Sequence, residues 1–159
     1  MTPEVPLTIT VNGREVSAAA GAHLSLLRWL RDVAGVTDPK YGCGEGICGA
    51  CTVLLNGQPV SACLVLAAQA DGAAVTTASG LLGADGSLGP LQRAFHEKHA
   101  AQCGFCTPGM LMAATAMLAD RRLRSRREIR NELHGNLCRC TGYGPIVDAV
   151  EMAQEEAGR

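Results

Sequence analysis

Alternating apolar and polar residues open the chain and predict short β-strands joined in hairpins. Two Asn-Gly dipeptides, Asn12-Gly13 and Asn56-Gly57, stand between such stretches and are typical of two-residue hairpin turns. The predicted strands cover residues 7–11, 14–18, 52–55, 59–63 and 74–77. Two hairpins and a last strand together predict a small sheet.

A different periodicity follows the first hairpin and predicts a helix. The apolar positions that would share one helical face are Leu24, Leu27, Leu30 and Val33. Trp29 lies beside this face and is predicted to enter the core. A helix that crosses a sheet of hairpins indicates an α+β domain over residues 1–78. Residues 79–89 are rich in Gly, Ser and Asp and are predicted to form a linker.

Beyond the linker the pattern is helical throughout. The predicted helices cover residues 91–100, 109–119, 128–134 and 146–156. Pro90 and Pro145 open the first and the last of them, and Thr107-Pro108 supplies an N-cap and a first-turn proline for the second. Ser125 to Glu128 has the form of a capping box before the third. Four helices with short connections predict a small bundle over residues 90–159.

Eight cysteines fall into two groups of four, and the first group surrounds a glycine-rich stretch. Cys43 to Cys51 reads Cys-Gly-Glu-Gly-Ile-Cys-Gly-Ala-Cys, and Cys63 follows it. This spacing is that of a plant-type ferredoxin, in which four thiolates hold a [2Fe–2S] cluster. Gly44, Gly46 and Gly49 allow the sharp turns that bring backbone N–H groups close to the sulfurs. The predicted ligands are Cys43, Cys48, Cys51 and Cys63.

The spacing leaves two other uses of the cysteines open. A structural zinc site also takes four thiolates, but it usually shows two C-x2-C pairs and has less need of intervening glycines. A disulfide framework is typical of short secreted chains, and the N-terminal residues carry no export signal. The cysteines are therefore interpreted as reduced metal ligands in a soluble, cytoplasmic protein.

The second group consists of two pairs in the helical part of the chain. Cys103 and Cys106 precede the predicted helix 109–119, and Cys138 and Cys140 precede the last helix. At a helix N-terminus, free N–H groups and the helix dipole favour a negative group. A C-x2-C pair combined with a C-x-C pair matches no common zinc pattern closely. Beside the first group, it indicates a second iron–sulfur cluster.

Composition and charge narrow the classes of function. The formal net charge is −1 over 159 residues, which favours neither nucleic acid nor a membrane as a partner. Aromatic residues make up only 3% of the chain, so bound metal is expected to help stabilise two small domains. The apolar stretch 109–119 is too short to span a bilayer.

Other features that could carry chemistry are interpreted as structural. The segment 121–130 holds six of the 14 basic residues and is predicted to be a solvated surface rather than a docking face. The four histidines show no ligand spacing, and no nucleophile–base pair or carboxylate pair stands out. No catalytic residue is predicted in this chain.

Three stretches together resemble the iron–sulfur subunit of the molybdenum hydroxylases, the xanthine oxidase family. They are Tyr41 to Val53, Gln102 to Gly109 and Gly135 to Tyr143, in this order. The resemblance covers nearly the whole chain. Gly144-Pro145 departs from the family pattern at the start of the last predicted helix.

The resemblance implies an α+β fold in which a β-grasp ferredoxin-like domain precedes a four-helix bundle, each with one [2Fe–2S] cluster. Gln102 and Cys140 match positions that approach the molybdopterin in the family. The ligands of the nearer cluster would be Cys103, Cys106, Cys138 and Cys140. The chain would be an electron-transfer subunit in a hetero-oligomer, with a large molybdopterin-binding subunit and a medium FAD-binding subunit as partners. A zinc-stabilised binding module and a free-standing double-cluster ferredoxin are the alternatives.

Overall fold

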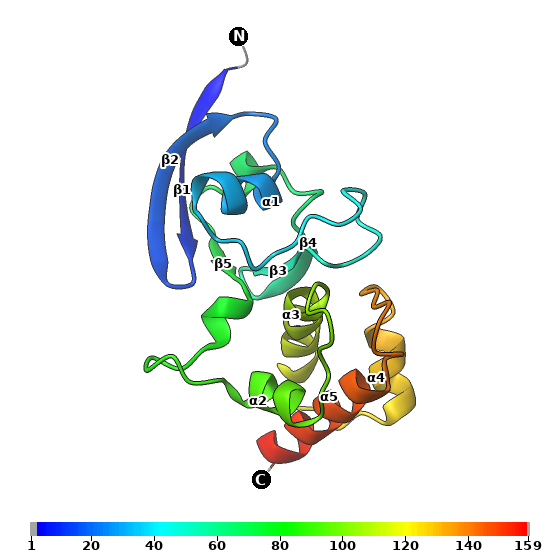
Figure 1. The fold of residues 1–159 in the computed structure, drawn as a ribbon. Helices are drawn as coiled ribbons and strands as arrows, with labels where there is room; N and C mark the ends of the chain where they lie inside the picture. The colour runs from blue at the N-terminus through cyan, green and yellow to red at the C-terminus, as the bar shows by residue number, and fades with distance from the viewer. Residues whose placement is uncertain (1–2, 159) are drawn as a thin grey trace.

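The computed structural model describes residues 3–158 and divides them between a sheet half (residues 3–77) and a helical half (residues 90–158) (Figure 1). The sheet has five strands in the order β2-β1-β5-β3-β4. The strands are β1 Glu4–Val11, β2 Arg14–Gly21, β3 Thr52–Leu55, β4 Gln58–Ser61 and β5 Ala74–Thr76. The α+β character predicted from the sequence is confirmed.

Both predicted hairpins form, and the last strand joins them. Asn12 and Gly13 have φ of 50° and 80°, and Asn56 and Gly57 have φ of 49° and 81°, which is the left-handed backbone of a tight hairpin turn. β5 lies between the hairpins, parallel to β1 and antiparallel to β3. The sheet is therefore continuous across segments far apart in the sequence.

The helix that crosses the sheet starts later than its apolar pattern suggested. Ser25 caps α1, Leu26–Arg28, which continues as a wider π-helical turn over Trp29–Val33. Trp29 is fully buried, as predicted. Val33 is 40% exposed, so its placement on the buried face was wrong. The wider turn holds more residues than an α-helical turn, which rotates Val33 away from the core. Leu26, which lies before this turn, is fully buried.

Four helices make up the helical half, and they are α2 Pro90–Glu97, α3 Thr107–Leu118, α4 Arg126–Glu132 and α5 Gly144–Ala157. The capping box at Ser125 and Glu128 is confirmed. The assignment of Thr107 as an N-cap was wrong, because Met110 N–H bonds the carbonyl of Cys106 and α3 therefore begins at Thr107. None of the helices within residues 3–158 is both long and apolar enough to cross a bilayer.

β3 and α3 join the two halves. Successive strand residues point to opposite faces, so Val53 packs in the core of the sheet half while Leu54 packs in that of the helical half. α3 lies directly beneath β3 (Figure 1) and is apolar almost all round. Its fully buried Met110 and Met112 therefore contact neighbours on several sides.

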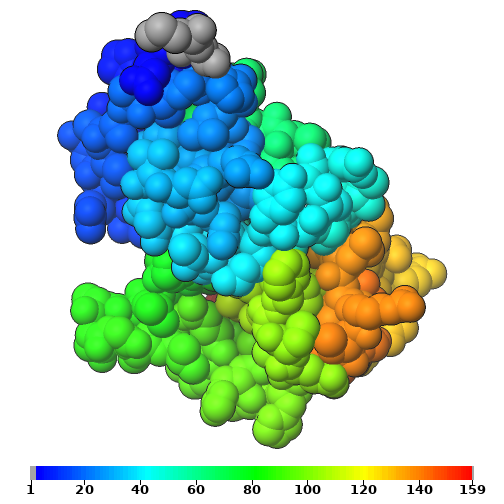
Figure 2. Space-filling view, turned by 45° about the horizontal axis from the view of Figure 1, so that its top comes forward, coloured from blue at the N-terminus to red at the C-terminus, as the bar shows by residue number. Residues whose placement is uncertain are grey.

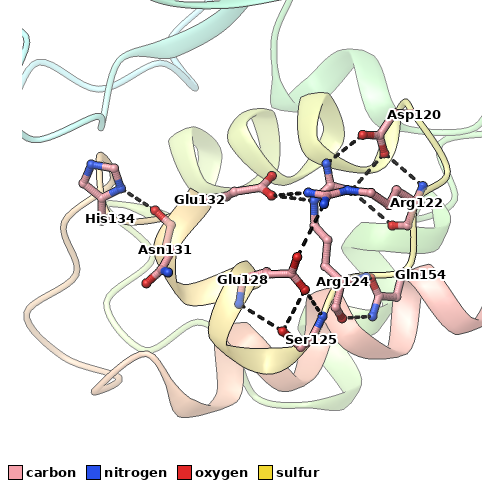
Figure 3. A network of polar contacts seen from close by, with 9 residues as sticks. All are labelled: Asp120, Arg122, Arg124, Ser125, Glu128, Asn131, Glu132, His134 and Gln154. Atoms are coloured by element: carbon pink, nitrogen blue, oxygen red, sulfur yellow. Dashed lines mark hydrogen bonds and ion pairs between the residues drawn. The ribbon is translucent and has the colours of Figure 1, made fainter.

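The basic segment 121–130 is only partly solvated, contrary to the prediction. Arg124 has a side chain that is 5% exposed, and its guanidinium bonds Asp120 at 2.9 Å and Glu132 at 2.7 Å (Figure 3). Its backbone exchanges two hydrogen bonds with the Gln154 amide of α5, at 3.0 and 2.8 Å. Hydrogen bonds from Arg124 and from the backbone lower the pKa of Asp120 to about 2. Through these ion pairs and hydrogen bonds, Arg124 connects the α3–α4 loop to α4 and α5.

Candidate metal centres

Backbone N–H groups converge on the first cysteine sulfur of the glycine-rich loop. The N–H groups of Glu45, Ile47 and Cys48 lie 3.4, 3.3 and 3.4 Å from the Sγ of Cys43. They lower the pKa of Cys43 to about 6, because hydrogen bonds to a thiolate favour the charged form. This is the arrangement expected for a sulfur that carries negative charge in a metal cluster.

Each of the three predicted loop glycines has a positive φ and a close neighbour. Gly44 and Gly46 both have φ of 74°, and an added Cβ would lie 2.7 Å from the Tyr41 hydroxyl oxygen or 2.4 Å from the Leu64 side chain, respectively. Gly49 has φ of 68°. A Cβ on Gly49 would meet the backbone oxygen of Gly135 at 2.5 Å, so Gly49 faces the helical half.

The other two thiols of the first group lie deeper. Cys51 is 2% exposed, and burial raises its pKa to about 12. The half-buried thiol of Cys63 is its neighbour. A buried thiol such as that of Cys51 ionises readily only when a metal compensates the charge.

The second group is assembled from two separate segments. The sulfurs of Cys103 and Cys140 lie 3.4 Å apart and both residues are exposed. Cys106 and Cys138 form a second, half-buried pair, and burial raises the pKa of Cys106 to about 12. The hydroxyl of Tyr143 accepts a hydrogen bond of 2.9 Å from the backbone N–H of Cys138, which braces the loop just before α5.

The thiols gather as pairs, and this fits a two-iron cluster. The neighbouring thiols are Cys43 with Cys48, Cys51 with Cys63, Cys103 with Cys140, and Cys106 with Cys138. In a [2Fe–2S] cluster each iron takes two of the four thiolates.

Three cysteine-bearing segments meet on one face of the molecule. Figure 2 shows the loop after α1 in cyan, the start of α3 in yellow-green and the segment before α5 in orange, side by side. A groove of about 610 Å³ lies between β4 and the helices α3 and α4, and none of the eight thiols lines it. The thiols thus lie outside this groove, and only Cys103 and Cys140 among them are exposed.

Comparison with known proteins identifies the family. A model of a 2Fe-2S iron-sulfur cluster binding domain matches residues 9–78, and a model of a [2Fe-2S] binding domain matches residues 77–151. The small subunit of nicotine 6-hydroxylase from Paenarthrobacter nicotinovorans is 47% identical over 97% of this chain and 92% of its own length. The chain belongs to the iron–sulfur small subunits of the molybdenum hydroxylases.

Solved structures agree with this family. A chain of quinoline 2-oxidoreductase from Pseudomonas putida 86 is similar with a TM-score of 0.93 and 42% identity, over 98% of this iron–sulfur subunit and 97% of that chain. Aldehyde oxidoreductase from Desulfovibrio desulfuricans gives a TM-score of 0.90 and 42% identity over 99% of this chain, but only 17% of its own. The same unit thus occurs as a separate chain and as part of a longer one.

Two residues important to the arrangement were not singled out from the sequence. Asn136 is buried between the halves, although it stands inside the motif Gly135 to Tyr143 that carries the resemblance. Arg124 is buried within a segment whose composition indicates a solvated surface. Gln102 is exposed next to Cys103.

Proposed function

We propose that this iron–sulfur subunit relays electrons through two [2Fe–2S] clusters within a molybdenum hydroxylase. The observation that carries the proposal is the gathering of eight free cysteines into two sets of four, each made of two pairs of neighbouring thiols. One set lies in each half of the chain, with the helical half corresponding to the four-helix bundle of the family. A bound cluster takes up and passes on one electron at a time.

The two sets of thiols would play different parts in this relay. Cys103 and Cys140 are exposed, so they hold the second site at the surface, and Gln102 lies beside them where a partner can dock. We therefore place the molybdopterin of a large partner subunit near Gln102 and Cys140. The thiols around Cys43 and Cys51 would then serve the onward step, toward FAD on a medium subunit or another acceptor.

The substrate is selected by the partner rather than by this chain. Among the relatives, the names nicotine 6-hydroxylase and quinoline 2-oxidoreductase refer to nitrogen heterocycles, and aldehyde oxidoreductase refers to aldehydes. Nitrogen heterocycles are thus the first substrates to test on the assembled enzyme, and aldehydes the second.

Metal analysis tests the proposal. The chain purified with its native partners should contain about four irons and about four acid-labile sulfides per copy in its [2Fe–2S] sites. The Cys138→Ala variant should lose about half of this iron, because it removes one ligand of one site only. Zinc in place of iron, or a full iron content in the variant, would contradict the proposal.

A further inference from the structure

The two cysteine sites are tied together by hydrogen bonds between the segments that flank their ligands. Asn136 is 6% exposed, and its side-chain N–H donates to the carbonyl oxygen of Gly49 at 2.9 Å and reaches the Thr52 hydroxyl at 3.3 Å. The backbone N–H of Leu137 donates to the carbonyl oxygen of Cys48 at 2.9 Å. Cys48 belongs to the first site, and Leu137 directly precedes Cys138 of the second.

Two glycines allow this contact to be as close as it is. A Cβ on Gly49 would lie 2.6 Å from the Asn136 amide nitrogen. A Cβ on Gly109, in the first turn of α3, would lie 2.1 Å from the carbonyl oxygen of Gly49. Both distances are shorter than any real contact of a side-chain carbon, so each half presents bare backbone to the other at this point.

We infer that Asn136 is a positioning residue that fixes the separation of the two cluster sites. The inference rests on the proposed function, because it assumes that both sites hold clusters. Asn136 lies two residues before Cys138, and its acceptor Gly49 directly follows Cys48. A shift of the Asn136 backbone therefore moves a ligand of the second site relative to a ligand of the first. Electron transfer falls steeply with distance, so such a site needs rigid support from neighbouring residues.

The chemistry of the amide makes the hydrogen bond specific. The Gly49 carbonyl also accepts hydrogen bonds from the N–H and the hydroxyl of Thr52, at 3.0 and 2.7 Å. Because the Thr52 hydroxyl directs its proton at this carbonyl, both groups that the Asn136 amide contacts are acceptors there. The contact therefore needs a donor at position 136, and a carboxylate there would face acceptors in a buried place. In the Asn136→Asp variant the new side chain is nearly the same size, but it carries acceptors only and would be repelled by the Gly49 carbonyl. The segments around Gly49 and position 136 should therefore move apart.

The experiment compares the full chain, loaded with iron, as wild type, Asn136→Asp and Asn131→Asp. Asn131 is exposed on α4, so its variant controls for the added charge. The fully reduced chain is examined by electron paramagnetic resonance, which reports the magnetic interaction between neighbouring clusters. Hydrogen exchange of peptides 43–52 and 133–140 reports the hydrogen bonds directly.

We expect Asn136→Asp to keep its iron while the interaction between the clusters weakens and both peptides exchange faster. Asn131→Asp should match the wild type. An unchanged interaction and unchanged exchange in Asn136→Asp would overturn the inference while leaving the proposed function intact. Absence of iron from the wild type would overturn the proposed function itself. If Asn136→Asp does not fold, Asn136→Ser, which retains a donor but cannot reach as far, is judged by the same outcomes.

Discussion

In the sheet half, three of the four candidate ligands lie on one loop, whereas in the helical half the ligands come from two segments that are distant in sequence. The first loop provides its own N–H groups, three of which point at the sulfur of Cys43. The second site depends on the shared core of the helical half to bring Cys106 to Cys138 and Cys103 to Cys140.

The first site is thus shaped mainly by local backbone geometry, whereas the second depends on tertiary packing. A glycine-rich loop can approach its final shape from backbone geometry alone, and its sheet is closed by hairpins with short loops. The second site forms only when four helices are already in place, and a bound cluster would in turn hold two of the helix starts together. The helical half should therefore depend more on its metal than the sheet half does.

Removal of the clusters should have the largest effect and act unequally on the two halves. We expect a chelated, cluster-free chain to lose much of the structure of α3 and α5, while β1 and β2 stay protected from hydrogen exchange. Circular dichroism and region-resolved hydrogen exchange measure this. Equal loss of protection in both halves, or an unchanged cooperative melt, would contradict the comparison.

Gly109→Ala should weaken the contact between the halves. Its new Cβ would lie 2.1 Å from the Gly49 carbonyl oxygen, and overpacking of this kind costs about 3 kcal/mol in the free energy of unfolding. Gly144→Ala is the matched control, because it also lies in the first turn of a helix and has no atom within 4 Å of an added Cβ. Denaturant unfolding of the two variants gives the difference, and equal stabilities would show that the contact is loose.

Arg124→Met should destabilise the helical half alone. The guanidinium is buried while its carboxylate partners Asp120 and Glu132 are partly exposed, so we expect a loss of about 2 kcal/mol rather than that of a fully buried pair. Arg127→Met, on an exposed residue of the same segment, should change stability by less than about 0.5 kcal/mol. Hydrogen exchange in α4 and α5 should rise in the first variant only. Faster exchange in the sheet half would mean that Arg124 supports both halves.

Gln102→Ala should have the smallest effect, which concerns rate and not stability. Gln102 is exposed and is not one of the cysteine ligands, so the iron content and the melting temperature should stay at their wild-type values. Substrate-driven reduction in the assembled enzyme should slow by about tenfold if a contact that positions the pterin is lost. Stopped-flow absorbance measures this rate.

The exposed Gln58 of β4 provides the control for Gln102→Ala. Arg126 is less suitable, because it forms an ion pair with Asp148 of α5 at 2.6 Å and its loss would disturb the helical half. A slow Gln58→Ala variant beside an unaffected Gln102→Ala variant would place the docking surface on the side of β4.

The features that could be predicted from the sequence are those set by neighbouring residues. The Asn12-Gly13 turn and the capping box from Ser125 to Glu128 depend on local backbone geometry, and both form as predicted. The start of α3 was misplaced by one position, since Thr107 and Cys106 are both compatible with the residues that follow. Such an ambiguity is settled by packing rather than by propensity.

Long-range contacts could not be predicted in the same way. Nothing in a run of arginines indicates that Arg124 would turn inward to meet Asp120, Glu132 and Gln154, because this depends on how the α3–α4 loop folds back. The role of Asn136 depends on a segment far away in the sequence, around Gly49. The cysteine sites could be proposed from the sequence because the ligand spacing is itself a sequence property.

The direction of electron flow is tested most directly with Cys63→Ala in the assembled enzyme. This variant removes a ligand of the first site and leaves the second site complete, so it should keep about two irons. When substrate is added, we predict that the remaining cluster is reduced while electrons no longer reach the acceptor. A remaining cluster that stays oxidised, under conditions in which the wild-type clusters are reduced, would contradict the entry of electrons through the helical half.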